Sequence, residues 1–307
     1  MIGSGLILVD KPGGWTSHDV VARVRRLAGT RKVGHAGTLD PMATGLLILG
    51  LNSSTRLLTY IVGADKEYLA TIRLGATTTT DDAEGEVTAE ADPAAVAAVT
   101  AAAIADGVAA LTGEIEQVPS SVSAIKVDGK RAYARVRAGE EVVLRPRAVT
   151  IERFDLLEER RLPADDAPVA IELDVRVVCS SGTYIRSLAR DLGAALGVGG
   201  HLTALRRTRI GPFEVRDARE LDTLDPGAAL IPAARAATAL FERLELTEQQ
   251  AIDLTHGRRI HVADREGASG APVAAIAPGG ALVGLVEFRG KEARTLVNFP
   301  TDEIASA

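Results

Sequence analysis

Residues 34–45 read GHAGTLDPMATG and lead directly into LLIL at residues 46–49. Three glycines and one proline in twelve positions predict a loop, and the apolar run that follows predicts a buried strand. Asp40 lies inside this loop, between Leu39 and Pro41. A carboxylate in a glycine-rich loop suits a nucleophile or a general base, because a ligand can approach such a backbone closely. From local rules alone, a helix N-cap is the commoner role for an aspartate before proline.

Strand and helix patterns surround this loop without the regular alternation of a doubly wound fold. We therefore predict an α+β fold with an antiparallel or mixed sheet. Strands are predicted at residues 6–9, 46–49, 68–74 and 169–178, and helices after Ser17 up to Gly29, over residues 94–111 with Asp92 as N-cap, and over residues 184–196.

The end of the chain has a different pattern. From about residue 244, short apolar runs alternate with glycine and proline, which predicts a small β-rich domain of about 60 residues. We expect two domains, one over residues 1–235 and a second over residues 240–307.

Charge is unevenly distributed along the 307 residues. The net charge of −6 argues at first against a nucleic-acid partner, because phosphate binding needs positive charge. Bases nevertheless outnumber acids by six to one in residues 11–35, by seven to three in residues 121–150 and by six to two in residues 183–216, whereas residues 81–117 hold nine acids and no base. Such segregation can focus a positive potential on one face, although solvated surfaces produce charge runs equally well.

Several classes of protein do not fit the composition. The single cysteine, Cys179, cannot form an internal disulfide, and no CxxC motif or dense Cys/His cluster offers a metal site. No dinucleotide fingerprint or P-loop is present. The opening residues lack a signal-peptide pattern, and no run reaches the roughly 20 apolar residues of a membrane span. We expect a cytoplasmic monomer without a metal or a cofactor.

Two further stretches contain candidate functional residues. Residues 179–186 read CSSGTYIR, a flexible turn before a helix, which puts Tyr184 and Arg186 in the first helical turn. An arginine there suits a buried carboxylate, whose pKa it would lower, but a surface arginine is as compatible with the pattern. Residues 205–209 read LRRTR, a basic cluster that suits phosphate contacts or a solvated face.

Taken together, separate blocks of the chain resemble one protein family. The chain is similar in order and rough spacing to the TruB family, the bacterial tRNA pseudouridine-55 synthases, over about residues 5–215. The blocks are GHAGTLDPMATGLL at 34–47, KEYLATIRLGATTTTDDAEGE at 66–86, SAIKVDGKRAYARVRAGE at 123–140, CSSGTYIRSLARDLG at 179–193 and HLTALRRTRIGPF at 201–213, with VDKPGGWTSHDVV at 9–21 as a further similarity.

The resemblance implies a fold, a reaction and a substrate. It implies a pseudouridine synthase catalytic domain, followed by a small PUA-like RNA-binding domain, and it implies the T-arm of tRNA as the partner, with no protein partner. Asp40 matches the catalytic nucleophile, which forms a covalent adduct while the base is detached, rotated and reattached through C5. Adduct formation at the base and at the ribose both remain open.

The resemblance also implies substrate-binding roles. Tyr68 matches the tyrosine that stacks on the flipped base and assists proton removal, and Tyr184 matches a second active-site tyrosine. Arg186 matches the arginine that pairs with the nucleophile, and Leu205 matches an apolar contact to the base. His35 matches the histidine that helps to fill the space left by the extruded nucleotide. Weaker expectations are RNA backbone contacts from Arg206, Arg207, Lys126 and Lys130.

Two parts of the chain depart from the family pattern. Residues 118–122 read VPSSV where the family usually has paired prolines and an aromatic residue, and the C-terminal segment with GRRIHVADR at 257–265 is a weaker match. Three alternatives stay open at this point. They are a synthase that acts on another RNA or with a guide RNA, an RNA-binding module without chemistry, and a nucleoside glycosidase that would release the base.

Overall fold

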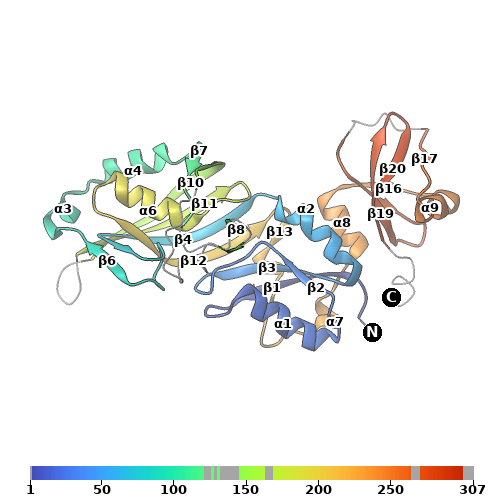
Figure 1. Cartoon of the computed structure of the whole chain (residues 1–307), viewed down its shortest axis with the longest axis horizontal. Helices are drawn as coiled ribbons and strands as arrows, with labels where there is room; N and C mark the ends of the chain where they lie inside the picture. Colours follow the sequence, from blue (N-terminus) through green and yellow to red (C-terminus); the bar gives the residue numbers. More distant parts are fainter. Residues whose placement is uncertain are drawn as a thin grey trace. The chain divides into compact units, whose positions relative to one another are not determined.

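The structure is a computed structural model that describes residues 2–120, 126–127, 130–131, 145–162, 169–263 and 270–299. The chain forms two compact units. Figure 1 labels most of the helices and strands named below. Unit 1 comprises Met1–Pro41, Gly45–Gly63 and Gly211–Ala307, and unit 2 comprises Met42–Thr44 and Ala64–Ile210. This division follows spatial contacts, so the sequence-based boundary between residues 235 and 240 stays a prediction.

Unit 1 contains a mixed sheet built around β1 (Gly5–Lys11). Strand β1 runs antiparallel to β3 (Thr44–Leu51) and β15 (Ile231–Pro232), and parallel to β14 (Arg219–Glu220). The short strand β2 (Val33–Ala36) pairs with β3 and places His35 opposite Leu49. The predicted loop at residues 34–45 is therefore wrong at both ends, because β2 and β3 extend into it.

Helix α1 (Ser17–Ala28) packs its valines on this sheet, in a core with Ile7 and Val9. The helix begins one residue earlier than predicted, because Thr16 is the N-cap and forms a capping box with Asp19. Gly29 ends the helix in the left-handed conformation at φ 64°, as its position predicts. Unit 1 continues with η1 (Asn52–Leu57), α2 (Leu58–Val62), β13 (Phe213–Glu214), η2 (Val215–Asp217), α7 (Pro226–Ala229) and α8 (Ala233–Leu240).

The last part of unit 1 is a five-stranded sheet with its own apolar core, as predicted for a small β-rich domain. Its order is β16 (Glu242–Glu245), β18 (Val273–Ile276), β19 (Leu282–Arg289), β20 (Glu292–Asn298) and β17 (Ile260–His261). Helix α9 (Glu248–Thr255) was not predicted, although Thr247 and Gln250 form a capping box at its start.

Unit 2 is an antiparallel sheet covered by helices. The strands follow the order β12 (Gly200–Ile210), β4 (Lys66–Leu74), β11 (Ala170–Cys179), β10 (Arg147–Leu162) and β7 (Gly113–Gln117). Two small pairs of antiparallel strands accompany it, β5 (Ala76–Thr78) with β6 (Val87–Glu90) and β8 (Lys126–Val127) with β9 (Lys130–Arg131). The two units together confirm the α+β class with mixed and antiparallel sheets.

Helices α4 (Ala101–Ala110) and α6 (Ile185–Ala195) lie on one face of the unit 2 sheet (Figure 1). Gly193 lets α6 approach the start of β12, because a Cβ at this position would lie 2.2 Å from the Gly199 carbonyl carbon. The single helix predicted over residues 94–111 is wrong. The chain forms α3 (Pro93–Ala98) and α4, because Val99 is extended and Thr100 provides a second N-cap. Asp92 is the N-cap of α3, as predicted.

Candidate functional site

The loop that holds Asp40 is anchored on both sides of this residue. On the N-terminal side, the buried hydroxyl of Ser17 donates to the Leu39 carbonyl at 3.2 Å, and the Leu39 amide donates to the Ser17 Oγ at 2.9 Å. Leu39 itself is buried, whereas Asp40 is half-buried. The reciprocal bonds fix the backbone immediately before the carboxylate, so Asp40 can meet a ligand without losing its position.

On the C-terminal side, the anchor is the Pro41 carbonyl. It accepts from the Lys11 ammonium at 3.1 Å and from the Gly14 amide at 2.9 Å. The Lys11 side chain is fully buried and also donates to the Trp15 carbonyl at 2.6 Å. A buried ammonium is tolerated when backbone carbonyls replace its water, so Lys11 joins the turn after β1 to the Asp40 loop.

His35 lies on β2 in the same unit as Asp40. Its ring meets the His18 ring edge to face, with the centroids 5.6 Å apart. His18 lies at the start of α1, so the helix that carries Ser17 also contacts His35 through this ring. Unit 1 thus holds two of the predicted site residues, one on a strand and one on the anchored loop.

Tyr68 and Leu205 lie on neighbouring strands of unit 2. Tyr68 is on β4 opposite Arg207 of β12, and Leu205 is opposite Ala70 of β4. The Tyr68 and Leu205 side chains are largely buried, and Arg207 is 1% exposed. An aromatic ring and a leucine at diagonal positions of two paired strands suit a dry slot for an uncharged ring.

Two titratable groups adjoin Tyr68. Burial, together with the nearby charge of Arg207, lowers the pKa of Lys66 to about 8. Burial raises the pKa of the Cys179 thiol to about 11. Lys66 and Cys179 are register partners on β4 and β11. Both groups therefore favour their neutral forms in this part of the sheet.

The N-terminus of α6 is held by a glutamine that sequence reasoning did not identify. Tyr184 is the N-cap of α6, not a residue of its first turn. Its amide donates to the Gln117 Oε1 at 2.8 Å, and its carbonyl accepts from the Gln117 Nε2 at 3.0 Å. Gln117 is 1% exposed and ends β7. One side-chain amide thus satisfies both backbone groups of Tyr184.

Arg186 contacts a carboxylate in unit 2 that was not anticipated. Its Nη1 lies 3.5 Å from the Asp82 Oδ2, and it donates to the Thr80 carbonyl at 2.8 Å. It also donates to the Ser120 hydroxyl at 3.4 Å. Arg186 and Asp82 are both nearly fully buried. The pair between Arg186 and Asp40 that the resemblance implies joins residues of different units, and it stays a prediction.

The residues expected to contact the RNA backbone differ in exposure. Arg206 is half-buried and donates to the Thr44 hydroxyl at 3.4 Å, whereas Arg207 is buried. Lys126 and Lys130 lie on the paired strands β8 and β9. In the C-terminal segment, Arg258 pairs with an aspartate and Arg259 is exposed, while Arg265 lies outside the described residues.

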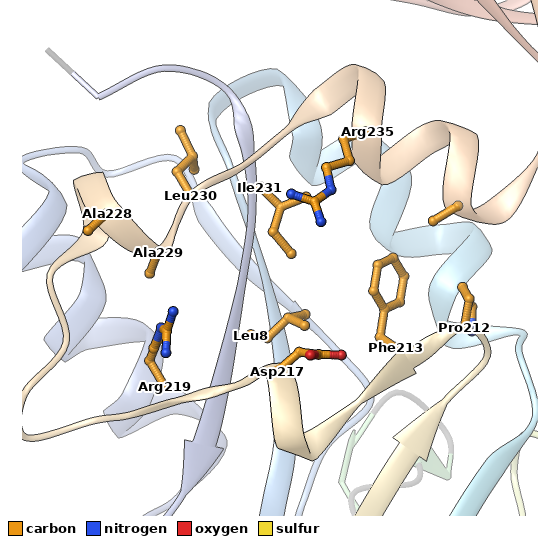
Figure 2. Close-up of a pocket in the computed structure, with 11 residues that line it drawn as sticks. Leu8, Pro212, Phe213, Asp217, Arg219, Ala228, Ala229, Leu230, Ile231 and Arg235 are labelled. Atoms are coloured by element: carbon orange, nitrogen blue, oxygen red, sulfur yellow. The ribbon is translucent and has the colours of Figure 1, made fainter.

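Two cavities lie on different parts of the molecule. One of about 490 Å³ in unit 2 is lined by Leu205 and Arg206, together with residues of β4 and β11. One of about 410 Å³ in unit 1 is lined mainly by apolar side chains, together with Asp217, Arg219 and Arg235 (Figure 2). The unit 1 cavity contains none of the predicted site residues, so the candidate site does not depend on it.

Comparison with known families decides the relationship. Residues 25–185 match the model for TruB family pseudouridylate synthase (N terminal domain), which is more than half of the chain. Residues 186–248 match tRNA pseudouridylate synthase B C-terminal domain, and residues 241–300 match tRNA Pseudouridine synthase II, C terminal. The chain belongs to the TruB family.

Relatives in the TruB family match nearly the whole chain. The tRNA pseudouridine synthase B of Leifsonia xyli subsp. xyli is 77% identical over 305 residues, which cover 99% of each protein. That of Paenarthrobacter aurescens is 58% identical over 301 residues, 96% of this chain and 95% of the relative.

This TruB family chain is also similar to chains of solved structures. A chain in the structure of an H/ACA RNP bound to a substrate RNA containing 2′-deoxyuridine gives a TM-score of 0.71 at 25% identity, covering 97% of this chain and 86% of that chain. A chain of a Cbf5-Nop10-Gar1 complex gives 0.69 at 27% identity, with the same coverage.

Proposed function

We propose that this chain is a tRNA pseudouridine synthase that isomerises the T-loop uridine of tRNA. The observation that carries the proposal is the 77% identity, along the whole chain, to a protein named tRNA pseudouridine synthase B. The solved H/ACA structures share the fold at 25–27% identity, which is a more distant relationship. A free tRNA substrate is therefore favoured over a guide-RNA particle.

In the proposed reaction, Asp40 acts as the nucleophile. The C1′–N1 bond of the uridine breaks, the detached base rotates, and a C1′–C5 bond forms. The hydrogen on C5 leaves as a proton and N1 gains one, so the reaction is redox-neutral. The anchors at Leu39 and Pro41 support this role, because a nucleophile must hold its position while its partner moves.

The target uridine must leave the RNA stack before Asp40 can reach it. Flipping a base costs a few kcal/mol, which an aromatic platform and an inserted side chain can offset. We propose Tyr68 as the platform and proton acceptor, and Leu205 as the apolar contact to the base. Their neighbouring positions on β4 and β12 support this assignment. His35 is proposed to help to fill the space left in the RNA.

We propose that Tyr184 and Arg186 complete the site from α6. The two hydrogen bonds between Gln117 and Tyr184 support precise placement of Tyr184, and the ion pair with Asp82 supports that of Arg186. A guanidinium close to Asp40 would keep that carboxylate ionised and ready to attack. The resemblance is the ground for this Arg186 role.

The remaining proposals concern partners and location. Arg206, Lys126 and Lys130 would contact the RNA backbone, and burial makes Arg207 the weaker candidate of the two neighbouring arginines. Residues 1–235 would form the catalytic domain, and residues 240–307 a PUA-like RNA-binding domain. We propose a cytoplasmic monomer. Among the described residues, no helix is long and apolar enough to cross a membrane.

A tritium-release assay tests the function. A tRNA transcript labelled with tritium at C5 of uridine is incubated with the protein, beside a transcript whose T-loop uridine is replaced by cytidine. Release from the first transcript alone is the expected result, because the C5 hydrogen is lost when C5 bonds to the ribose. Binding of both transcripts without release would instead favour an RNA-binding module, and release of free uracil would favour a glycosidase.

A further inference from the structure

Two arginines of α6 meet two consecutive aspartates of one turn. Arg186 and Arg190 are four residues apart, which puts them on the same face of the helix. The Arg186 Nη1 lies 3.5 Å from the Asp82 Oδ2, and the Arg190 Nη1 lies 3.4 Å from the Asp81 Oδ2. The helix is therefore joined to the turn by two ion pairs, and these follow opposite orders along the two segments, since the later arginine meets the earlier aspartate.

The backbone of the turn makes this arrangement possible. Consecutive side chains of an extended strand point to opposite faces, so they cannot both meet one helix. Asp81 has φ 60°, in the left-handed region that aspartate tolerates better than most residues. The turn is fixed on the sheet side as well, since the Leu202 amide donates to the Asp81 carbonyl at 3.0 Å and the Thr78 hydroxyl donates to the Asp82 carbonyl at 2.8 Å.

The two ion pairs differ in exposure. The side chains of Arg186 and Asp82 are 5% and 3% exposed, whereas those of Arg190 and Asp81 are 27% and 16% exposed. A buried pair stabilises only when its geometry is good, because both charges have lost water. The more exposed pair, Arg190 with Asp81, lies beside the buried pair, Arg186 with Asp82. It can therefore fix the distance between α6 and the turn, on which the geometry of the buried pair depends.

A third attachment lies beside the outer pair. Arg190 Nη2 donates to the Val118 carbonyl at 2.8 Å, and the Ser187 hydroxyl donates to the same carbonyl at 3.0 Å. Arg190 thus joins the turn, α6 and the end of β7 at one point. Asp191, which also pairs with Arg190 at 2.9 Å, is its neighbour on the helix and adds no link to the turn.

We propose that Asp81 and Arg190 form a positioning pair, which holds the turn against α6 and so orients the Arg186 guanidinium on Asp82. The proposal rests on the proposed function in one respect, which is the assignment of Arg186 to the active site. Neither Asp81 nor Arg190 is proposed to touch the substrate. Burial raises the pKa of Asp81, while the Ser120 hydrogen bond and the Arg190 charge oppose this rise, which is consistent with a carboxylate held in place by its partner.

The test compares Asp81→Asn and Arg190→Gln with the conservative Arg190→Lys. Asparagine tolerates positive φ, so Asp81→Asn removes the charge and spares the turn. Glu159→Gln is the matched control, because it breaks an ion pair of 2.7 Å with Arg161 elsewhere in unit 2. The two readouts are the single-turnover rate of pseudouridine formation, and the nuclear magnetic resonance signals of the Arg186 guanidinium in the protein without RNA.

We expect Asp81→Asn and Arg190→Gln to lower the single-turnover rate by about 10- to 100-fold, the scale of a displacement near 1 Å, with little change in tRNA affinity. The Arg186 signals should broaden or shift in both variants, Arg190→Lys should restore part of the rate, and Glu159→Gln should match wild type. Unchanged Arg186 signals, or an unchanged rate, would overturn the proposal. If wild type formed no pseudouridine, the proposed function would fail, while the Arg186 signals would still decide whether the pair positions this arginine.

Discussion

Gln117 and Tyr184 are joined by two hydrogen bonds, although 67 residues separate them in the sequence. The Gln117 side-chain amide bonds to both the backbone amide and the backbone carbonyl of Tyr184, which is the N-cap of α6. Strand β7 thereby sets the start of the helix that carries Arg186.

Gln117→Met should destabilise the protein and lower its turnover number. Methionine keeps the volume but removes both hydrogen bonds of Gln117 to Tyr184, each worth about 0.5–1.5 kcal/mol. The Tyr184 carbonyl keeps the bond from the Leu188 amide at 3.3 Å, so the larger loss is at the Tyr184 amide. We expect a lower midpoint of urea unfolding and a lower turnover number, with a smaller effect on the Michaelis constant. An unfolding midpoint equal to that of wild type would show that water or neighbouring groups replace the two hydrogen bonds of Gln117.

Ser17→Ala should reduce turnover through the backbone beside Asp40. The change removes both bonds to Leu39, so the loop loses its N-terminal anchor. Thr16→Ala is the control, because it removes the N-cap of the same helix, typically about 1 kcal/mol, without touching Leu39. Turnover should fall further in Ser17→Ala than in Thr16→Ala at a temperature where both variants are folded. Equal losses would mean that only helix stability matters.

Arg206→Ala and Arg207→Ala should have different effects, although the residues are adjacent. Arg206 is half-buried at the edge of a cavity, so its loss should weaken tRNA binding and lower the slope of log affinity against log salt by about 0.7–0.9, the effect of one phosphate. Arg207 is 1% exposed, so its loss should mainly lower the unfolding free energy. The converse pattern, in salt titrations and urea melts of both variants, would refute this division.

The single cysteine provides a probe of unit 2. Cys179 is buried, and its pKa of about 11, against an ordinary value of 9.0, leaves about 100-fold less thiolate at pH 8. Reaction with a thiol reagent should therefore be slow in the native protein and fast in denaturant. Rapid native labelling, measured beside a short thiol peptide, would show that this part of the sheet opens readily.

Lys66 should make stability depend on pH above neutrality. Its folded pKa of about 8 lies below the ordinary value of 10.5, so the unfolded chain binds a proton that the folded chain does not between these values. The free energy of unfolding from Lys66 should therefore rise with pH across this window. The contribution of Cys179 to the free energy of unfolding should fall with pH between about pH 9 and pH 11, because its pKa is raised in the folded chain.

The measurement therefore uses a Cys179→Ala background. Urea unfolding of this variant, with and without Lys66→Met, should show a steeper rise from pH 8 to 10 when Lys66 is present. Parallel pH profiles would contradict the lowered pKa of Lys66.

Local patterns predicted much of the fold, because periodicity and caps depend on near neighbours. They predicted strands within β1, β4 and β11, and helices α1 and α6. The errors arose where two local signals competed. A threonine followed three residues later by aspartate marks Thr16 as the N-cap, and Thr100 marks the second helix start inside residues 94–111.

The site was less predictable, because its contacts join distant strands and loops. The residues that the resemblance assigns were available from motifs, but their supports were not. Gln117 simply ends a short strand, and Asp81 and Asp82 received no individual role, although they lie in an acidic run and in the block at residues 66–86. Register and the positive φ of Asp81, which bring these groups to α6, come from tertiary structure.

Asp40→Asn tests the central claim most directly. The substitution keeps the size of the side chain and the anchors at Leu39 and Pro41, and it removes the nucleophilic charge. With tRNA labelled with tritium at C5 of uridine and enzyme in excess, we predict no release above background, while tRNA affinity stays close to that of wild type. Release at a rate within tenfold of wild type would show that Asp40 is not the nucleophile.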